Sequence, residues 1–167
     1  MNELIEPFER LLAGVSTPAA VRAIEAGGSA AALWEAIESS GFLDALVAQE
    51  YGGYGLSLAD VFGLWVATGR RVTPVPVGHT MVARAALAKA GGPTTRGPIA
   101  IASLAQDQGG RVVSRQTTFG LVADWFVVPL PDRWLLLPRQ GAKCISSGIQ
   151  GSLHATRLIT DLICSLL

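Results

Sequence analysis

Apolar side chains recur at intervals of three and four residues through the first ninety positions, which is the spacing of one buried face of an α-helix. The pattern runs through SAAALWEAIESSG (29–41), SLADVFGLWVATGRR (57–71) and HTMVARAALAKAGG (79–92). It predicts a series of short amphipathic helices that share one core.

Residues that favour helix ends bracket these segments. Thr17 precedes Pro18, which is the usual order of an N-cap and a first helical residue, and the glycine pair at 27–28 marks a stop. Ser57 and Asp60 have the spacing of a capping box. The punctuation therefore agrees with the helical periodicity.

Beyond residue 97 the pattern changes to short runs rich in β-branched and aromatic residues. The runs are PIAIASLA (98–105), RVVSR (111–115), DWFVVPL (124–130) and RWLLLPR (133–139). We expect an α+β protein, with an N-terminal helical bundle domain followed by a small antiparallel β-barrel or β-sheet domain. The expected bounds are 1–92 for the helical domain, 97–157 for the β domain and 158–167 for a truncated C-terminal tail, where GSLHATRLITDLICSLL (151–167) fits either strand or helix.

The stretch QEYGGYGLSLAD (49–60) places three glycines between two helical segments. A phosphate-binding loop needs a buried strand before it and a helix after it, and its glycines follow other spacings. LDALVAQE (43–50) has no β-branched run, so the glycines are predicted to turn the chain from one helix to the next.

The composition is unusually apolar: half of the residues are hydrophobic, 16% are charged and the mean hydropathy is +0.40, against roughly 25% charged residues in average soluble chains. No apolar run approaches the roughly 18 residues that a bilayer requires. The acidic N-terminus MNELIEPFER does not resemble a signal or transit peptide. We expect a cytoplasmic protein whose apolar surface is covered by a partner chain or by further sequence.

Net charge is zero but unevenly distributed. Residues 1–60 hold nine acidic side chains and only two basic ones, for a charge of −7, and residues 61–167 carry +7. A basic second half suits a polyphosphate ligand such as a nucleotide or coenzyme A, although an acidic helical surface followed by a less acidic one would give the same numbers. No Lys/Arg-rich run occurs, so nucleic acid is not an expected partner.

Histidine and cysteine give no metal signal. His79 and His154 stand apart from other ligand residues, and Cys144 and Cys164 form no CxxC motif. We expect no metal site and two free thiols.

Two charged pairs remain. Glu35 and Glu38 lie three residues apart and are predicted to form a solvated helix face. Arg70 and Arg71 either meet a phosphate or carboxylate or follow the preference of basic residues for helix C-termini.

Residues 33–92 resemble the N-terminal helical domain of acyl-CoA dehydrogenases. The likeness lies in an aromatic-bearing helix, a GF turn, the QEYGGYGLS loop, a long helix, a proline-containing break and a second apolar helix that ends in glycine. The β-rich segment that follows also agrees with the order of domains in that family. In the family this loop joins helices and does not bind the flavin.

The flavin motifs of the β domain are only partly present. SLAQDQGG lacks the acidic, Pro-Gly pattern of the family, and its Ser103 stands near a threonine position. QTTFGLVAD (116–124) matches the second motif at Thr118 and in its final AD, but Gln116 replaces a tryptophan and Phe119 an asparagine. The resemblance implies an FAD cofactor contacted by Thr118 and Ser103.

The family also implies an acyl-CoA thioester substrate and its α,β-desaturation. The wall of the acyl cavity would include Val77, His79, Thr80 and Met81, from VGHTMV (77–82). In the family a C-terminal helical bundle supplies the catalytic glutamate, and this chain ends at Leu167 before that bundle. We therefore expect no catalytic residue in this chain, no activity when it is alone, and a partner that is a complete acyl-CoA dehydrogenase subunit or a homo-oligomer.

Two alternatives stay open at this point. Besides a subunit that works only with a partner, the chain could be a non-catalytic interaction or scaffold protein, or a truncated remnant of an acyl-CoA dehydrogenase.

Overall fold

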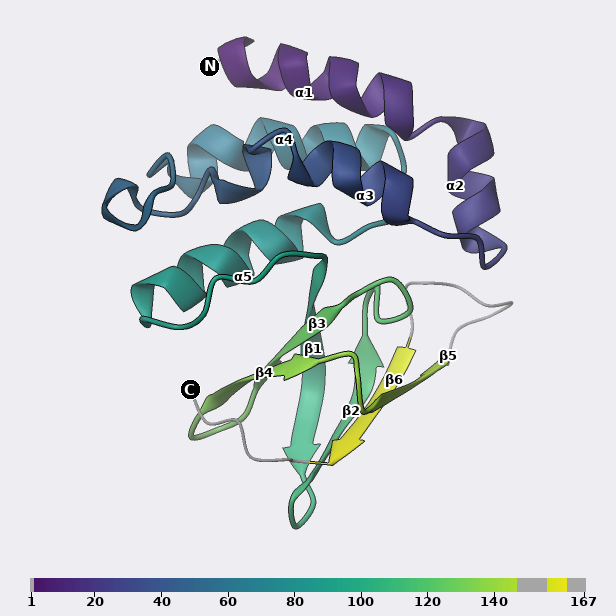
Figure 1. Cartoon of the computed structure of the whole chain (residues 1–167), viewed down its shortest axis with the longest axis vertical. Coiled ribbons are helices and arrows are strands. Elements are labelled where there is room, and N and C mark those ends of the chain that lie inside the picture. The colour runs from purple at the N-terminus through teal and green to yellow at the C-terminus, as the bar shows by residue number, and fades with distance from the viewer. Residues whose placement is uncertain (1, 147–155, 162–167) are drawn as a thin grey trace. The chain divides into compact units, whose positions relative to one another are not determined.

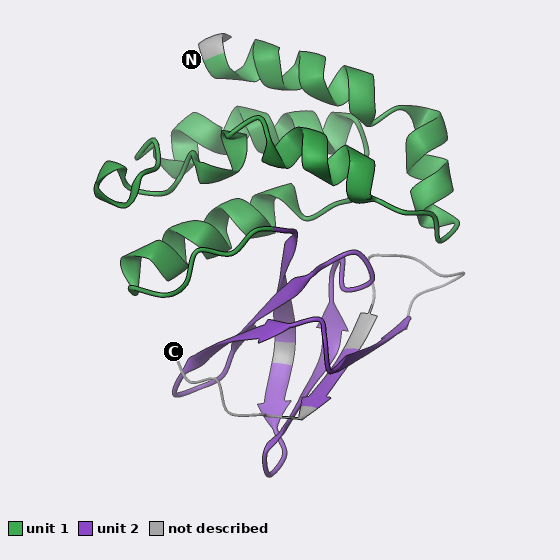
Figure 2. Cartoon of the chain, viewed as in Figure 1, with its two compact units in different colours: residues 1–96 green, residues 97–167 purple. Residues whose placement is uncertain are grey.

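The computed structural model describes residues 2–146 and 156–161 (Figure 1). The chain divides into two compact units, residues 1–96 and 97–167 (Figure 2). All described α-helices belong to the first unit and all described strands to the second. The predicted α+β class, with the helical part first, is confirmed.

The helical unit follows the predicted order. Its helices are α1 (Asn2–Val15), α2 (Pro18–Glu25), α3 (Ala31–Glu38), α4 (Leu58–Arg70) and α5 (Val77–Lys89), with 3-10 turns η1 (Phe42–Asp44) and η2 (Gln49–Tyr51) between α3 and α4. The predicted caps are confirmed: Thr17 accepts a hydrogen bond from the Ala20 amide at the start of α2, and Ser57 and Asp60 bond reciprocally in a capping box at the start of α4.

The core of the helical unit forms where α1 packs on α4. Phe8 of α1 is fully buried and meets Phe42 edge to face, with ring centroids 5.0 Å apart. A side chain at Gly63 would collide with Ile5, since an added Cβ would lie 2.3 Å from its Cδ1 atom. The glycine therefore lets α1 approach α4 closely.

The glycine loop is a turn between helical segments, as predicted. The described residues directly before it form no strand, since 42–51 contain the two 3-10 turns joined by a short turn. Gly52 and Gly55 have positive φ angles of 86° and 66°. Gly53 is required for space, since an added Cβ would lie 2.2 Å from the carbonyl oxygen of Val47.

Val72 ends α4 in an unfavourable conformation. The amide of Thr73 donates to the carbonyl of Thr68, a bond that reaches back over the last helical turn, and Val72 itself has a φ of 49°. A β-branched residue is a genuine outlier in this region, where glycine is preferred. The Val72 side chain is exposed, so little packing compensates the strain.

Val72→Gly is therefore expected to raise the melting temperature, because removing the left-handed strain stabilises the unit by about 1 kcal/mol. Thermal unfolding followed by circular dichroism measures it. Val72→Ala keeps a Cβ and serves as the control, with a smaller gain expected. An unchanged or lower melting temperature for Val72→Gly would contradict the assignment of strain.

The second unit is a curled six-stranded sheet with the order β4-β3-β1-β2-β6-β5. The strands are β1 (Ile99–Asp107), β2 (Arg111–Thr117), β3 (Trp125–Pro129), β4 (Trp134–Pro138), β5 (Ala142–Ser146) and β6 (Thr156–Asp161). The first four coincide with the predicted runs. β5 was not predicted, and β6 falls within the segment that fitted either strand or helix. His154 and Cys164 lie outside the described residues, as does the whole of 162–167.

In one detail the sheet differs from the expected antiparallel arrangement. β1 and β3 run parallel, with Ile99 opposite Trp125 and Ile101 opposite Val127, and all other neighbours are antiparallel. The turn after β2 passes the start of β1, where the Pro98 carbonyl accepts hydrogen bonds from the Asp124 and Trp125 amides. This return places β3 beside β1 in the same direction.

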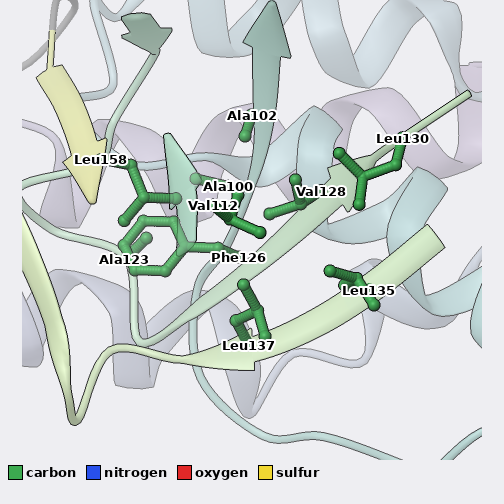
Figure 3. Close-up of a cluster of buried hydrophobic side chains, with 10 residues drawn as sticks. All are labelled: Ala100, Ala102, Val112, Ala123, Phe126, Val128, Leu130, Leu135, Leu137 and Leu158. Atoms are coloured by element: carbon green, nitrogen blue, oxygen red, sulfur yellow. The ribbon is translucent and has the colours of Figure 1, made fainter. Parts of the chain in front are cut away.

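One cluster of apolar side chains forms the core of the sheet (Figure 3). Phe126 lies among aliphatic residues from the other strands and is fully buried. The members are Ala100, Ala102, Val112, Ala123, Phe126, Val128, Leu130, Leu135, Leu137 and Leu158. The apolar composition of the runs seen in the sequence thus produces a core within the second unit.

Candidate functional site

The candidate flavin contacts lie where β1 pairs with β2. Ser103 of β1 stands opposite Gln116, and Ala102 stands opposite Thr117, the last residue of β2. Thr118 begins the turn that leads to β3. The pairing thus brings Ser103 of β1 close along the ladder to the end of β2, where Thr118 follows.

Ser114 supports this end of β2 from inside. Its buried hydroxyl donates to the Ser103 carbonyl at 2.6 Å, and it lies 3.0 Å from the Thr117 hydroxyl. The network joins the backbone of β1 to the residue before Thr118. These hydrogen bonds would therefore hold the backbone beneath a site on this surface in place.

The side-chain hydroxyls of Ser103 and Thr118 have no hydrogen-bond partner among the described residues. Ser103 is exposed and Thr118 half-buried. Each is free to donate or accept one hydrogen bond from a ligand.

Arg139 holds the turn that follows Thr118. Its Nη1 donates to the Gly120 carbonyl at 2.6 Å and to the Ala123 carbonyl at 3.3 Å, and it contacts the Cys144 sulfur at 3.7 Å. The Arg139 amide also donates to the Asp124 carbonyl. This arginine, which the sequence did not single out, is a positioning residue for the turn.

Titratable groups of this turn are shifted toward their neutral forms. Partial burial raises the pKa of the Asp124 carboxyl, and the positive charge of Arg139 opposes that rise. Burial likewise raises the pKa of the Cys144 thiol against the charge and hydrogen bond of Arg139. Cys144 is a free cysteine, as predicted, and its raised pKa makes it a poor nucleophile.

Phe119 keeps a backbone conformation that suits another residue. Its φ is 62°, in the left-handed region where asparagine is several-fold enriched. The family resemblance aligns an asparagine with this position. Phe119 therefore occupies a left-handed conformation in which an asparagine would be less strained.

The predicted acyl-cavity residues lie in the first turns of α5, in the other unit. Val77, Thr80 and Met81 are buried, and the Trp65 indole N–H donates to the Met81 sulfur at 3.3 Å. His79 is half-buried, and its burial lowers its pKa, so the imidazole is neutral near pH 7. These four residues share one helix end, while Ser103 and Thr118 belong to the sheet.

A buried ion-pair network in the helical unit was not predicted. Arg84 of α5 pairs with Glu38 of α3 and, at 3.1 Å, with Asp44 of η1, and the Trp34 N–H donates to Glu38 at 2.8 Å. The prediction that Glu38 is solvated is wrong: its side chain is 7% exposed, whereas Glu35 is exposed. Helical spacing gave no sign of Arg84, the partner 46 residues further along the chain.

Other kinds of site find no support in the part of the chain that the structure describes. Across residues 2–146 and 156–161, no group of three or more His, Cys, Asp or Glu side chains is arranged to hold a metal ion. Of the described helices, none has both the length and the apolar character that a membrane crossing needs.

The fold resembles several solved structures at low sequence identity. The similarity to the ChsE4-ChsE5 complex from Mycobacterium tuberculosis covers 96% of this chain and 53% of the matched chain of that complex. The sequence identity is 19% and the TM-score 0.67. The Tcur3481-Tcur3483 steroid ACAD G363A variant matches 96% and 54%, with 20% identity and a TM-score of 0.72. The HsaA monooxygenase from M. tuberculosis matches 99% and 51%, with 17% identity and a TM-score of 0.62.

Neither a protein-family model nor a curated protein sequence matches this chain. The chain spans about half the length of the solved structures that it resembles. The predicted resemblance is confirmed at the level of fold: the chain has the acyl-CoA dehydrogenase fold over its helical unit and the sheet that follows.

Proposed function

We propose that this chain is an acyl-CoA dehydrogenase-like subunit that takes part in FAD-dependent α,β-desaturation of an acyl-CoA thioester only together with a partner subunit. The observation that carries the proposal is the fold shared with the steroid ACAD over 96% of the chain. The partner supplies the catalytic glutamate, and this chain alone does not turn over acyl-CoA.

The surface near the end of β2 is the proposed flavin contact. Thr118 and Ser103 present hydroxyls with no other bond in the described residues, which fits a ligand with ring nitrogens and carbonyl oxygens. When bound, FAD supplies the two-electron acceptor for the reaction. Arg139 holds the backbone after Thr118 and Ser114 contacts the Thr117 hydroxyl before it, so that the Thr118 hydroxyl is positioned before the cofactor arrives.

The start of α5 is the proposed part of the acyl-cavity wall. Val77 and Met81 give it an apolar interior, beside the buried Thr80. The lowered pKa of His79 keeps this half-buried side chain uncharged, which suits a neighbouring hydrocarbon chain better than an imidazolium would.

A partner subunit is supported by the exposed apolar side chains of the helical unit. Leu58 and Phe62 lie one turn apart on α4 and are 60% and 61% exposed. One similar structure is itself a complex, that of ChsE4 and ChsE5. A heteromer with a complete acyl-CoA dehydrogenase subunit would cover such a surface.

Co-expression of the chain with the products of its neighbouring genes tests the proposal. We expect a co-purifying yellow complex with flavin absorbance. In that complex Thr118→Val is expected to weaken flavin binding about tenfold, because one hydrogen bond to the cofactor is lost. Thr94→Val makes the same change at an exposed site in the helical unit and should leave flavin binding unaltered.

Three results would overturn the proposal. A colourless complex would favour the scaffold function, and a chain that aggregates in the presence of every candidate partner would favour the remnant. Turnover of an acyl-CoA by the purified chain alone, with an artificial electron acceptor, would disprove the need for a partner.

A further inference from the structure

A cavity of about 290 Å³ in the helical unit is lined by three arginines. Arg22 comes from α2, Arg70 from the last turn of α4, and Arg71 caps the same helix. Apolar atoms of Pro18, Val21 and Val72 complete the walls. The cavity lies wholly within the helical unit and shares no residue with the proposed flavin or acyl contacts.

Few negatively charged side chains compensate the charge of these three arginines. Arg70 pairs with Glu9 at 3.0 Å. The side chains of Arg22 and Arg71 make no ion pair or hydrogen bond to any other residue that the structure describes. Three positive groups facing one negative partner leave a local excess of two charges.

This excess stands out in its surroundings. Residues 1–60 carry a charge of −7 with only two basic side chains, and one of those two, Arg22, lines the cavity. The preference of bases for helix C-termini accounts for the position of each arginine, since Arg22 lies in the last turn of α2 and Arg70 and Arg71 lie at the end of α4. All three residues are exposed, and the two helix ends bring them to the walls of one cavity, where a bound anion would offset their mutual repulsion.

Backbone contacts fix one side of the cavity. Ser16, which is 2% exposed, donates its hydroxyl to the Arg71 carbonyl at 3.3 Å and so ties the end of α1 to the end of α4. Val72 is held in its left-handed conformation directly after Arg71. The backbone that carries Arg71 is therefore defined without any ligand.

We propose that this arginine cavity binds a phosphate group. A phosphate monoester carries about −1.5 to −2 charges at neutral pH, which matches the excess of two. Planar guanidinium groups donate paired hydrogen bonds to phosphate oxygens, and several can share one phosphate. The phosphate belongs either to a soluble molecule or to a lipid headgroup.

Isothermal titration of the purified full chain with inorganic pyrophosphate at low salt tests the soluble source. One site per chain is expected, with an affinity that falls as NaCl is added. Sedimentation with phosphatidylcholine vesicles that contain phosphatidic acid tests the lipid source. Arg22→Gln and Arg71→Gln are each expected to weaken whichever binding is seen about tenfold, which corresponds to about 1.4 kcal/mol.

Arg10→Gln is the matched control, since Arg10 is exposed on α1 and pairs with Glu6 away from the cavity. Its side chain does not line the cavity, so the variant removes the same charge and should leave binding unaltered. Arg71→Lys keeps the charge but loses the planar fork and should bind with intermediate affinity. Circular dichroism melting verifies that each variant folds.

The proposal is overturned if neither pyrophosphate nor the acidic vesicles bind. It is equally overturned if Arg10→Gln weakens binding as much as Arg71→Gln does, because the effect would then follow net charge and not the cavity.

Discussion

Replacing Arg84 by methionine is expected to lower the free energy of unfolding of the helical unit by about 3–5 kcal/mol. Arg84 is 8% exposed and joins Glu38 of α3 to Asp44 of η1. Without it the Glu38 carboxylate, whose side chain is 7% exposed, stays buried and loses the guanidinium that pairs with it. Urea unfolding followed by circular dichroism measures the loss.

Two controls separate the buried charge from lost packing. The double variant Glu38→Met with Arg84→Met removes both charges and is expected to recover much of the stability, because a hydrophobic pair often replaces a buried ion pair at little loss. Arg10→Met breaks the exposed pair with Glu6 at 3.2 Å and should change stability by less than about 1 kcal/mol. Equal losses in Arg84→Met and Arg10→Met would show that burial of the pair does not matter.

Gly53→Ala is expected to destabilise the same unit by about 3 kcal/mol, at the upper end for an overpacked site. The new Cβ would lie 2.2 Å from the Val47 carbonyl oxygen and 2.4 Å from its Cβ. Backbone atoms cannot rotate away, so the loop between η2 and α4 has to move. The shift in urea midpoint, converted with the measured slope, gives the loss.

Other glycines provide the controls. Gly52 has a φ of 86° but open space around its Cα, so Gly52→Ala adds strain without collision and should lose about 1 kcal/mol. Gly14 lies in α1 with nothing within 4 Å, so Gly14→Ala should gain about 0.5–1 kcal/mol. A loss at Gly53 no larger than at Gly52 would contradict the collision.

Local signals predicted the local features of this fold. Helix periodicity and capping residues such as Ser57 and Thr17 act over a few positions, and the structure places them at the helix starts as expected. Four of the six strands follow runs of β-branched and aromatic residues. The glycine loop at 49–60 likewise turns the chain between helical segments, as its residues predict.

Features that depend on distant residues were missed. β5 (AKCIS) has no alternation that marks a strand, and it forms through pairing with β6. The burial of Glu38 depends on Arg84, which lies 46 residues away in the sequence. The parallel pairing of β1 and β3 depends on how the intervening turn returns to the start of β1.

In the candidate site, too, the sequence indicated some residues, and a contact between distant parts of the chain was missed. The resemblance pointed to Thr118 and Ser103, and pairing of β1 with β2 places Ser103 near the end of β2, which Thr118 follows. Arg139, which holds the turn after Thr118, comes from the far end of β4 and carries no sequence motif. A supporting contact of this kind needs the tertiary structure to be seen.

The position of β6 has a consequence for the order in which the sheet assembles. β6 lies between β2 and β5, so these two strands never pair with each other. During synthesis β5 emerges before β6 and waits without a neighbour, and one edge of β2 stays open until Thr156–Asp161 has left the ribosome. Because the pairing of β2 with β6 joins distant parts of the chain and open strand edges attract other chains, we expect the nascent protein to be prone to aggregation in this interval.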